Sequence, residues 1–305
     1  MIKKIKGYSL DEKIGIGAHG GIVYKATSLA KQEQVAVREL PANLCTNVGF
    51  VSELISRCQR ARYFDHRHIV NTRELIEENR QYYIVLDYFD GKNLDRAFGA
   101  KKIIETELAV KIAMQTAGAL SYLHSKQFYH GDIRPHNLMI DDTGAIKISE
   151  VEMPNIYGIR GLDVTVMGTG VYCAPDLVSG KYDAASDIYA LGVTLYRLAT
   201  GTVSPFGVKP KLPSAINPEI PPELERIIMQ AMAPAASGRF ASAWEMMRQL
   251  GSIIGEENCC AGTRPMPQPY FSPQRDNRQI PALPASPSSL WQSFKRKLTG
   301  KNKGE

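Results

Sequence analysis

The sequence is poor in several features, and each shortage excludes a class of protein. Its 305 residues include five cysteines, and no two stand at C-x-x-C spacing, so the pattern predicts reduced thiols rather than a disulfide framework or a zinc site. No run approaches the ~18 consecutive apolar residues that a membrane span needs. The lysine-rich residues 1–6 are followed by no apolar signal-peptide core. We therefore expect a soluble, cytoplasmic protein.

Basic charge is in excess, but the excess is confined to one part of the chain. Lys and Arg total 37 against 31 Asp and Glu, a formal net charge of +6. Residues 262–305 hold 8 Lys/Arg, 2 Asp/Glu and 7 of the 18 prolines, whereas residues 1–261 hold 29 of each sign. Because the composition changes just after the apolar helical pattern ends near Ile254, we place a domain boundary at about residue 258. We expect no nucleic-acid partner.

The 44% of hydrophobic residues suffices for a large core, and their spacing changes along the chain. Short β-branched runs predict strands between residues 8 and 40, and again around 74–76 and 82–86. Apolar residues at helical spacing predict helices over 48–64, from 105 onward, and near 184–199, 222–233 and 240–250. This order indicates an α+β fold in residues 1–258, with a β-rich N-lobe (8–90), an α-rich C-lobe (91–258) and a ligand cleft between them.

Residues 130–137 read His-Gly-Asp-Ile-Arg-Pro-His-Asn, and residues 150–152 read Glu-Val-Glu. The first run resembles the catalytic loop of protein kinases, and the second stands where that family carries Asp-Phe-Gly. The resemblance implies a bilobal protein kinase-like fold in which Asp132 orients the acceptor hydroxyl and Arg134 replaces the usual Lys. It also implies that Asn137 and Glu150 hold the metal ion. A capping role for Asp132 and a surface position for the acidic pair Glu150 and Glu152 are the alternatives.

The Glu-Val-Glu run departs from the family at the metal site. Glu150 still offers oxygen ligands, but its extra methylene moves the carboxylate, and magnesium demands near-ideal octahedral geometry at ~2.1 Å. Glu152 replaces a glycine and adds a negative charge near the position of the phosphates. We therefore expect magnesium or manganese binding to be weak or absent.

The glycine-rich residues 15–26 resemble the kinase glycine loop, in which backbone N–H groups approach the nucleotide phosphates. The loop is one residue longer than the family pattern, so Gly15, Gly17 and Gly21 take the three glycine positions. An ordinary hairpin turn is the alternative.

Residues 35–38 read Val-Ala-Val-Arg where kinases have Val-Ala-Ile-Lys, and a planar guanidinium is not equivalent to an ammonium there. In the family register, Arg57 stands where a Glu normally pairs with that lysine. Two cations cannot form this bridge. We expect either that Glu53, on the same helix face, replaces the missing Glu after a shift of about one turn, or that Arg57 faces solvent.

Residues 86–91 resemble the hinge between the kinase lobes, with Leu86 as gatekeeper and with Asp87 and Phe89 beside the adenine. The resemblance implies that Val23, Ala36 and Met139 enclose the base, and that ATP can bind. Ordinary core packing of these apolar residues is the alternative.

Further matches lie in the predicted C-lobe. Residues 168–176 resemble the Gly-Thr-x-x-Tyr-x-Ala-Pro-Glu segment of Ser/Thr kinases, and Asp187 with Gly192 resembles the helix start that follows it. Arg239 stands where kinases place the buried partner of the acid in that segment, here Asp176. The resemblance therefore runs from about residue 8 to 250 and is to the bacterial Ser/Thr type.

Two functions remain open at this point. The altered phosphate Lys, its Glu partner and the metal Asp favour a catalytically impaired pseudokinase, a regulatory or scaffolding module for a protein partner. The alternative is an active, divergent kinase that transfers the ATP γ-phosphate to Ser/Thr hydroxyls of a protein substrate. Small-molecule phosphotransfer, as in aminoglycoside phosphotransferases, rests on the His-Gly-Asp triplet alone.

The end of the chain has a composition of its own. Residues 259–288 form a proline-rich linker, whereas Leu290, Trp291, Phe294 and Leu298 fall on one helical face beside basic residues in 289–305. This basic amphipathic tail suits an anionic membrane surface, with the protein peripheral to it, or an acidic partner. Docking onto the kinase-like domain, or disorder, is the alternative.

Overall fold

The computed structural model describes residues 3–99, 102–154, 170–175, 182–204 and 208–255. These residues lie in one compact unit, Met1–Cys259. Among them, no helix combines the length and the apolar composition that crossing a bilayer requires. The segments predicted over 259–288 and 289–305 lie outside the described residues, as do Gly168, Thr169 and Asp176.

Six strands of the described chain form the N-lobe sheet, in the order β1-β2-β3-β4-β6-β5, and neighbouring strands are antiparallel. They are β1 (Lys3–Ile5), β2 (Tyr8–Ile16), β3 (Ile22–Ser28), β4 (Gln34–Glu39), β5 (Thr72–Glu78) and β6 (Gln81–Asp87). The register places Val23 opposite Arg38 and Ala36 opposite Leu86. Val23, Ala36 and Arg38 therefore share the central strands β3 and β4.

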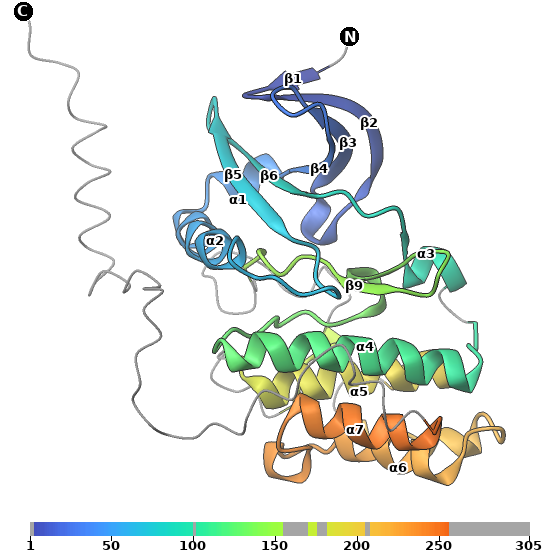
Figure 1. The fold of residues 1–305 in the computed structure, drawn as a ribbon. Coiled ribbons are helices and arrows are strands. Elements are labelled where there is room, and N and C mark those ends of the chain that lie inside the picture. The colour runs from blue at the N-terminus through green and yellow to red at the C-terminus, as the bar shows by residue number, and fades with distance from the viewer. Residues whose placement is uncertain (1–2, 100–101, 155–169, 176–181, 205–207, 256–305) are drawn as a thin grey trace, which may run out of the picture. The chain divides into compact units, whose positions relative to one another are not determined.

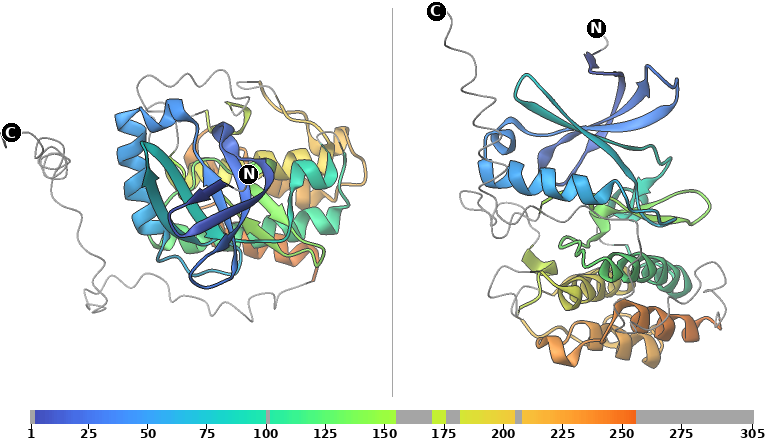
Figure 2. Two further views of the ribbon diagram at one scale, coloured as in Figure 1. Left: turned by 90° about the horizontal axis from the view of Figure 1, so that it is seen from above. Right: turned by 60° about the vertical axis from the view of Figure 1, so that its left-hand side comes forward.

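Helix α2 (Val48–Ala61) packs on one face of this sheet, after the short helix α1 (Ala42–Cys45). The Asn47 side chain accepts the Phe50 N–H at 2.9 Å and so begins α2. Phe50, Leu54 and Cys58 are buried in one apolar cluster with β6 residues. Figure 2 shows α2 along the sheet, on the side of the C-lobe. This position brings α2 against the residues of the catalytic-loop motif.

The first part of the C-lobe consists of α3 (Leu94–Phe98), the long helix α4 (Thr106–Ser125) and a small antiparallel sheet. That sheet contains β7 (Lys92–Asn93), β8 (Leu138–Ile140) and β9 (Ile146–Ile148). The 3-10 helix η2 (Pro135–Asn137) leads directly into β8. Because Leu138 pairs with Ile148, the residues that precede β8 and those that follow β9 emerge side by side. This hairpin juxtaposes the two motifs that lie 13 residues apart in sequence.

Three helices complete the C-lobe: α5 (Ala184–Thr200), α6 (Pro222–Ala231) and α7 (Ala243–Ile253). Short 3-10 turns are η1 (Ala18–Gly20) in the N-lobe and η4 (Gly170–Tyr172), η5 (Pro213–Ala215) and η6 (Ala236–Gly238) in the C-lobe. Helix α5 begins where the Asp183 side chain accepts the Ser186 N–H at 2.8 Å. Helix α7 begins with Ser242 accepting the Glu245 N–H at 3.1 Å, while Glu245 accepts the Ala241 N–H.

Figure 1 shows the strands of the N-lobe at one end and the stacked helices α4 to α7 at the other. Leu120, Leu123, Ile188 and Leu195 are fully buried between these helices. The predicted α+β, two-lobe fold is confirmed, and the helix and strand positions agree within a few residues. The sequence patterns missed β1, α1, α3 and β7 to β9, which are too short to show a period.

The close approach of α5 and α6 depends on Gly192. A Cβ built there would lie 2.7 Å from the Ala231 Cβ, 3.1 Å from the Met232 Cγ and 3.2 Å from the Ala231 carbonyl carbon. We expect Gly192→Ala to lower the free energy of unfolding by about 1–3 kcal/mol, because the helices must separate. Denaturant unfolding followed by circular dichroism measures this.

Gly118→Ala in α4 is the matched control. Its new methyl would meet the flexible Met247 Sδ at 3.3 Å, and alanine gains helix propensity of roughly 1 kcal/mol over glycine. We expect no loss of stability there. Equal losses in both variants would contradict the packing argument.

Candidate active site

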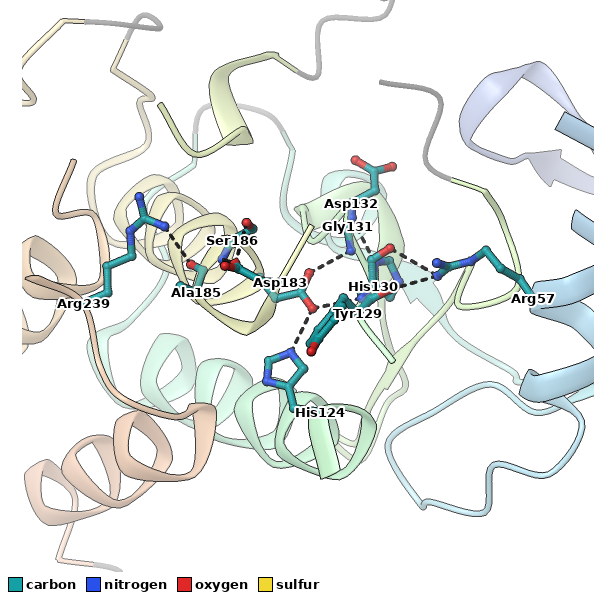
Figure 3. A network of polar contacts seen from close by, with 11 residues as sticks. Arg57, His124, Tyr129, His130, Gly131, Asp132, Asp183, Ala185, Ser186 and Arg239 are labelled. Atoms are coloured by element: carbon teal, nitrogen blue, oxygen red, sulfur yellow. Dashed lines mark hydrogen bonds and ion pairs between the residues drawn. The ribbon is translucent and has the colours of Figure 1, made fainter. Parts of the chain in front are cut away.

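Asp187, in the first turn of α5, anchors the catalytic-loop motif. Its carboxylate accepts the backbone N–H of His130 at 2.9 Å and that of Gly131 at 2.7 Å, and lies 2.9 Å from His124 Nε2. Figure 3 shows His124, His130 and Gly131 converging on this point. Burial raises the pKa of Asp187, but the hydrogen bond from His124 and neighbouring donors lower it by more, so the net pKa lies below its usual value. Asp187 is therefore an ionised anchor.

His130 joins this loop to the segment after β9. Its Nδ1 accepts the Asp132 N–H at 3.1 Å, and its Nε2 donates to the Ser149 carbonyl at 2.9 Å. Because the ring is buried, its pKa is lowered and the imidazole is neutral. The Ser149 N–H also donates to the Asn137 carbonyl at 2.9 Å. The two motifs thus form one rigid unit.

The three predicted catalytic residues lie together. Asn137 Nδ2 donates to Asp132 Oδ2 at 2.8 Å, and Arg134 Nε lies 3.2 Å from Asp132 Oδ1. The side chains of Asp132 and Arg134 are 16% and 14% exposed, so the carboxylate remains accessible. Asn137 Nδ2 also donates to the Asp132 carbonyl at 2.8 Å, so the alternative of a capping or structural role for Asp132 stays open. This arrangement can orient an incoming hydroxyl group.

Arg38 is paired with both glutamates of the altered motif. Its Nη2 lies 3.0 Å from Glu150 Oε1, and its Nη1 lies 3.0 Å from Glu152 Oε1. The three side chains are at most 4% exposed. The Glu150 backbone has φ 68°, a left-handed conformation that is costly for a residue with a Cβ. The ion cluster of Arg38, Glu150 and Glu152 thus holds a strained backbone in place.

This cluster corrects two expectations. The acidic pair is buried rather than at the surface, because Arg38 compensates its charge. Glu53 is exposed, and the carboxylates on Arg38 come from residues 150 and 152, so the predicted replacement by Glu53 is wrong. Both residues stand out in the sequence as departures from the family pattern, with Arg instead of Lys at position 38 and Glu instead of Gly at position 152. Their charges are opposite, but only the fold shows that they lie side by side.

Arg57 on α2 contacts the C-lobe rather than solvent. Its Nη2 donates to the carbonyls of Val151 at 2.8 Å, Tyr129 at 3.1 Å and His130 at 3.4 Å, and two of these contacts are visible in Figure 3. The guanidinium also lies 4.3 Å from the centroid of the Phe128 ring. Burial lowers the pKa of Arg57 to about 10, so it stays charged at neutral pH. The expectation that Arg57 faces solvent is wrong. Its guanidinium points into the protein because it donates hydrogen bonds to three backbone carbonyls.

The glycine loop bends sharply over the ion cluster. Within η1, His19 has φ 64°, Gly17 N–H donates to the Gly21 carbonyl at 2.7 Å, and Gly20 N–H donates to the Gly17 carbonyl at 3.2 Å. A Cβ on Gly17 would lie 2.9 Å from Glu150 Oε1 and 3.0 Å from Arg38 Nε. Gly17 is required by this close approach. Gly15 pairs with Val23 across the hairpin.

The residues predicted to enclose adenine share one apolar cluster. Val23 and Met139 are partly buried against Ala36, which is 8% exposed, and against Leu86. At the hinge, the Asp87 carboxylate accepts from Asn71 Nδ2 at 3.0 Å and Arg73 Nε at 2.6 Å. The Lys147 ammonium lies 5.8 Å from the Phe89 ring centroid. The base side of the site is therefore apolar and partly accessible.

The residues predicted to hold a metal ion do not fit one as they are arranged. Glu150 Oε1 is paired with the Arg38 guanidinium, and a second cation beside it would be repelled. Asn137 Oδ1 is buried without a hydrogen-bond partner in the described chain, which makes it a candidate oxygen ligand. Among the described residues, no group of three or more His, Cys, Asp or Glu is placed to share an ion.

Comparison with known proteins accounts for this geometry. The protein kinase domain model matches residues 8–237. The chain belongs to the protein kinase family. Its relatives include Serine/threonine-protein kinase PrkC of Bacillus subtilis, 29% identical over 92% of this chain and 45% of that protein. Serine/threonine-protein kinase PknB of Mycolicibacterium smegmatis is 30% identical over 80% of this chain and 42% of its own length.

Solved kinase structures share the fold. The Mycobacterium tuberculosis PknI kinase domain matches with a TM-score of 0.70 at 23% identity, over 82% of this chain and 97% of that one. Rad53 1–466, solved in complex with AMP-PNP, matches with a TM-score of 0.63 at 21% identity, over 80% of this chain and 65% of that one. The chain spans less than half the length of the curated kinases named above. The comparisons thus show a Ser/Thr protein kinase fold.

Arg239 occupies a structural position in this kinase fold. It donates to the carbonyls of Ala233, Pro234 and Ala185 at 2.8–3.1 Å, and its guanidinium lies 5.0 Å from the Tyr189 ring centroid. Its predicted partner Asp176 lies outside the described residues.

The buried charge of Glu152 makes stability depend on pH. Burial raises its pKa above the ordinary 4.5, with Arg38 opposing and Glu150 reinforcing the shift. Above pH 4.5 the folded state therefore binds more protons than the unfolded state, and the free energy of unfolding falls as pH rises. We expect Glu152→Gln, which keeps an acceptor for Arg38, to show a flatter decline of the free energy of unfolding between pH 5 and pH 8 than the wild type. Denaturant unfolding across this range measures it.

Glu12→Gln, at an exposed position on β2, is the control and should leave the pH profile unchanged. If Glu152→Gln loses as much free energy of unfolding between pH 5 and pH 8 as the wild type does, a group other than Glu152 causes the pH dependence.

Arg57 should contribute more stability than its neighbour Arg60, which makes two exposed carbonyl contacts. We expect Arg57→Met to lower the free energy of unfolding by about 2–4 kcal/mol, because buried carbonyls lose a charged donor. Arg60→Met should cost less than about 1 kcal/mol, since its contacts are exposed. Urea unfolding of both variants provides the comparison; equal costs would contradict a special role for Arg57.

Proposed function

We propose that this protein is a kinase-fold module with impaired phosphotransfer that works by binding a protein partner. The observation that carries the proposal is the pairing of both Arg38 Nη atoms with Glu150 and Glu152. In the family, the residue at position 38 grips phosphates and the residue at position 150 holds the metal. Here the two side chains bind each other instead.

Charge compensation extends beyond this pair. Arg134 faces Asp132, and Arg57 faces three carbonyls, so each of these cations already has a partner. Phosphoryl transfer relies on positioning and on cations that stabilise the charge of the γ-phosphoryl group. ATP is the nucleotide that the kinase fold implies, but the cations Arg38, Arg57 and Arg134 are already bonded to groups of the protein. Impaired catalysis follows from that deficit.

An active, divergent Ser/Thr kinase is the second candidate, and a specific observation favours it. Asp132, Arg134 and Asn137 have an arrangement that can orient a hydroxyl, with Asp132 partly accessible. The relatives named above are called Ser/Thr kinases. In this reading Arg38 would exchange Glu150 for phosphate when nucleotide binds.

The protein is proposed to act in the cytoplasm. A protein partner, or a protein substrate in the second reading, is the class that the kinase fold supports. For residues 289–305 we keep the proposal of contact with an anionic membrane surface or an acidic partner, on their basic and apolar composition.

Transfer of the labelled γ-phosphate of ATP tests the proposed function. The purified protein is incubated with magnesium and then with manganese, alone and with a generic basic protein, beside Asp132→Asn. We expect the wild type and Asp132→Asn to give the same background with either metal, because positioning of Asp132 cannot compensate for the occupied Arg38.

Transfer by the wild type that disappears in Asp132→Asn would establish the active kinase and overturn the proposal. Transfer that persists unchanged in Asp132→Asn would indicate a contaminating kinase and therefore count as background.

A further inference from the structure

We propose that the glycine loop and the ion cluster occupy the phosphate side of the site permanently, so that the domain binds uncharged adenine-type ligands such as adenosine more tightly than ATP. This inference rests on the proposed function and names the ligand class of the same site. The phosphate side is defined here as Arg38, Glu150 and residues 15–21, and the base side as Val23, Ala36 and Met139.

Two backbone donors of the loop, the N–H groups of Gly17 and Gly20, are bonded within the loop itself. A glycine loop binds phosphates through free N–H groups. In this loop, Gly17 N–H donates to the Gly21 carbonyl and Gly20 N–H donates to the Gly17 carbonyl. The residue in excess of the family pattern allows the chain to close on itself as the turn η1. Phosphate would have to break these hydrogen bonds before it could accept either N–H group.

His19 lies at the tip of that turn and faces into the site. Its Nδ1 is buried and has no hydrogen-bond partner in the described chain. The ring lies near enough to Glu150, Asp132, Arg134 and Arg38 to interact electrostatically with all four. Burial lowers its pKa, so the ring is neutral and supplies no cation to a phosphate. His19 thus fills volume without adding positive charge.

The loop lies close to the ion cluster, and β2, which leads into it, is tied to the C-lobe. Gly17 approaches Arg38 and Glu150 so closely that a Cβ would contact both. From the C-lobe, Arg96 on α3 donates through Nη1 to the Ile14 carbonyl at 3.0 Å, which ties β2 to the C-lobe. The loop is therefore positioned by the ion cluster at Gly17 and by the Arg96 hydrogen bond at Ile14.

The charges of the site oppose a triphosphate. Three carboxylates, Glu150, Glu152 and Asp132, face two guanidinium groups, Arg38 and Arg134. An approaching ATP must displace carboxylates from these cations and then lie beside them. A nucleoside carries no charge into this region.

The base side lacks these obstacles. Val23 and Met139 are partly exposed and share an apolar cluster with Ala36 and Leu86. A planar heterocycle can cover this surface, and its burial is favourable at roughly 25 cal/mol per Å². Ligand affinity therefore comes from the base rather than from the phosphates.

Isothermal titration calorimetry with adenosine, AMP, ADP and ATP tests the inference, first with EDTA and then with magnesium. We expect affinity to fall as phosphates are added, with ATP on the order of tenfold or more weaker than adenosine, equivalent to about 1.4 kcal/mol. Magnesium should not restore the affinity for ATP.

His19→Gly tests the loop directly, because glycine keeps the positive φ while removing the ring. We expect this variant, and separately Arg96→Ala, to bind ATP more tightly and adenosine as before. Gln32→Gly is the matched control: Gln32 has φ 55° in an exposed turn between β3 and β4, so the substitution relieves the same backbone strain away from the site. The ratio of its affinity for adenosine to its affinity for ATP should equal that of the wild type.

Tighter binding of ATP than of adenosine by the wild type, or no binding of adenosine, would overturn the inference. The inference would also be overturned if both His19→Gly and Arg96→Ala kept the wild-type ratio of adenosine affinity to ATP affinity. Because these are binding measurements, tight ATP binding without phosphate transfer would refute this inference and leave the proposed function standing. Transfer that requires Asp132 would refute the proposed function instead.

Discussion

The ion cluster of Arg38, Glu150 and Glu152 determines most of the geometry around it. A buried ion pair adds little net stability, but breaking one by removing a partner costs about 3–5 kcal/mol. The cluster therefore fixes the end of β4 against the segment after β9, and with it the left-handed backbone of Glu150. The glycine at position 17 follows from the same contact, because no side chain fits between the loop and these charges.

The site has two halves that are built differently. In the C-lobe, Asp187 accepts the N–H groups of His130 and Gly131, and the Asn137 side chain donates to the Asp132 carboxylate. In the N-lobe, the groups that would bind phosphate are bonded to one another. Phosphoryl transfer needs both halves at once, whereas partner binding needs a stable fold and an accessible surface. The division between the halves is therefore the physical basis of the proposed function.

The fold was predictable from the sequence because long periodic segments dominate it, such as α4 with its stripe of Ile112, Ala119 and Leu123. The catalytic loop was predictable because its residues are close in sequence. The ion cluster was not, since Arg38 and Glu152 are distant in sequence and only the fold brings them together. Arg57 was misjudged for a similar reason: its partners are backbone carbonyls, which leave no mark in a sequence.

The contacts of α2 with the C-lobe also bear on how fast ligands can exchange. Arg57 and Arg60 both lie over the Phe128 ring and donate to C-lobe carbonyls, so α2 is bound to the lower lobe at several points. Separation of the lobes on this side would expose all of these groups together. A small molecule that binds at the base side therefore exchanges without separation of the two lobes on the side of α2.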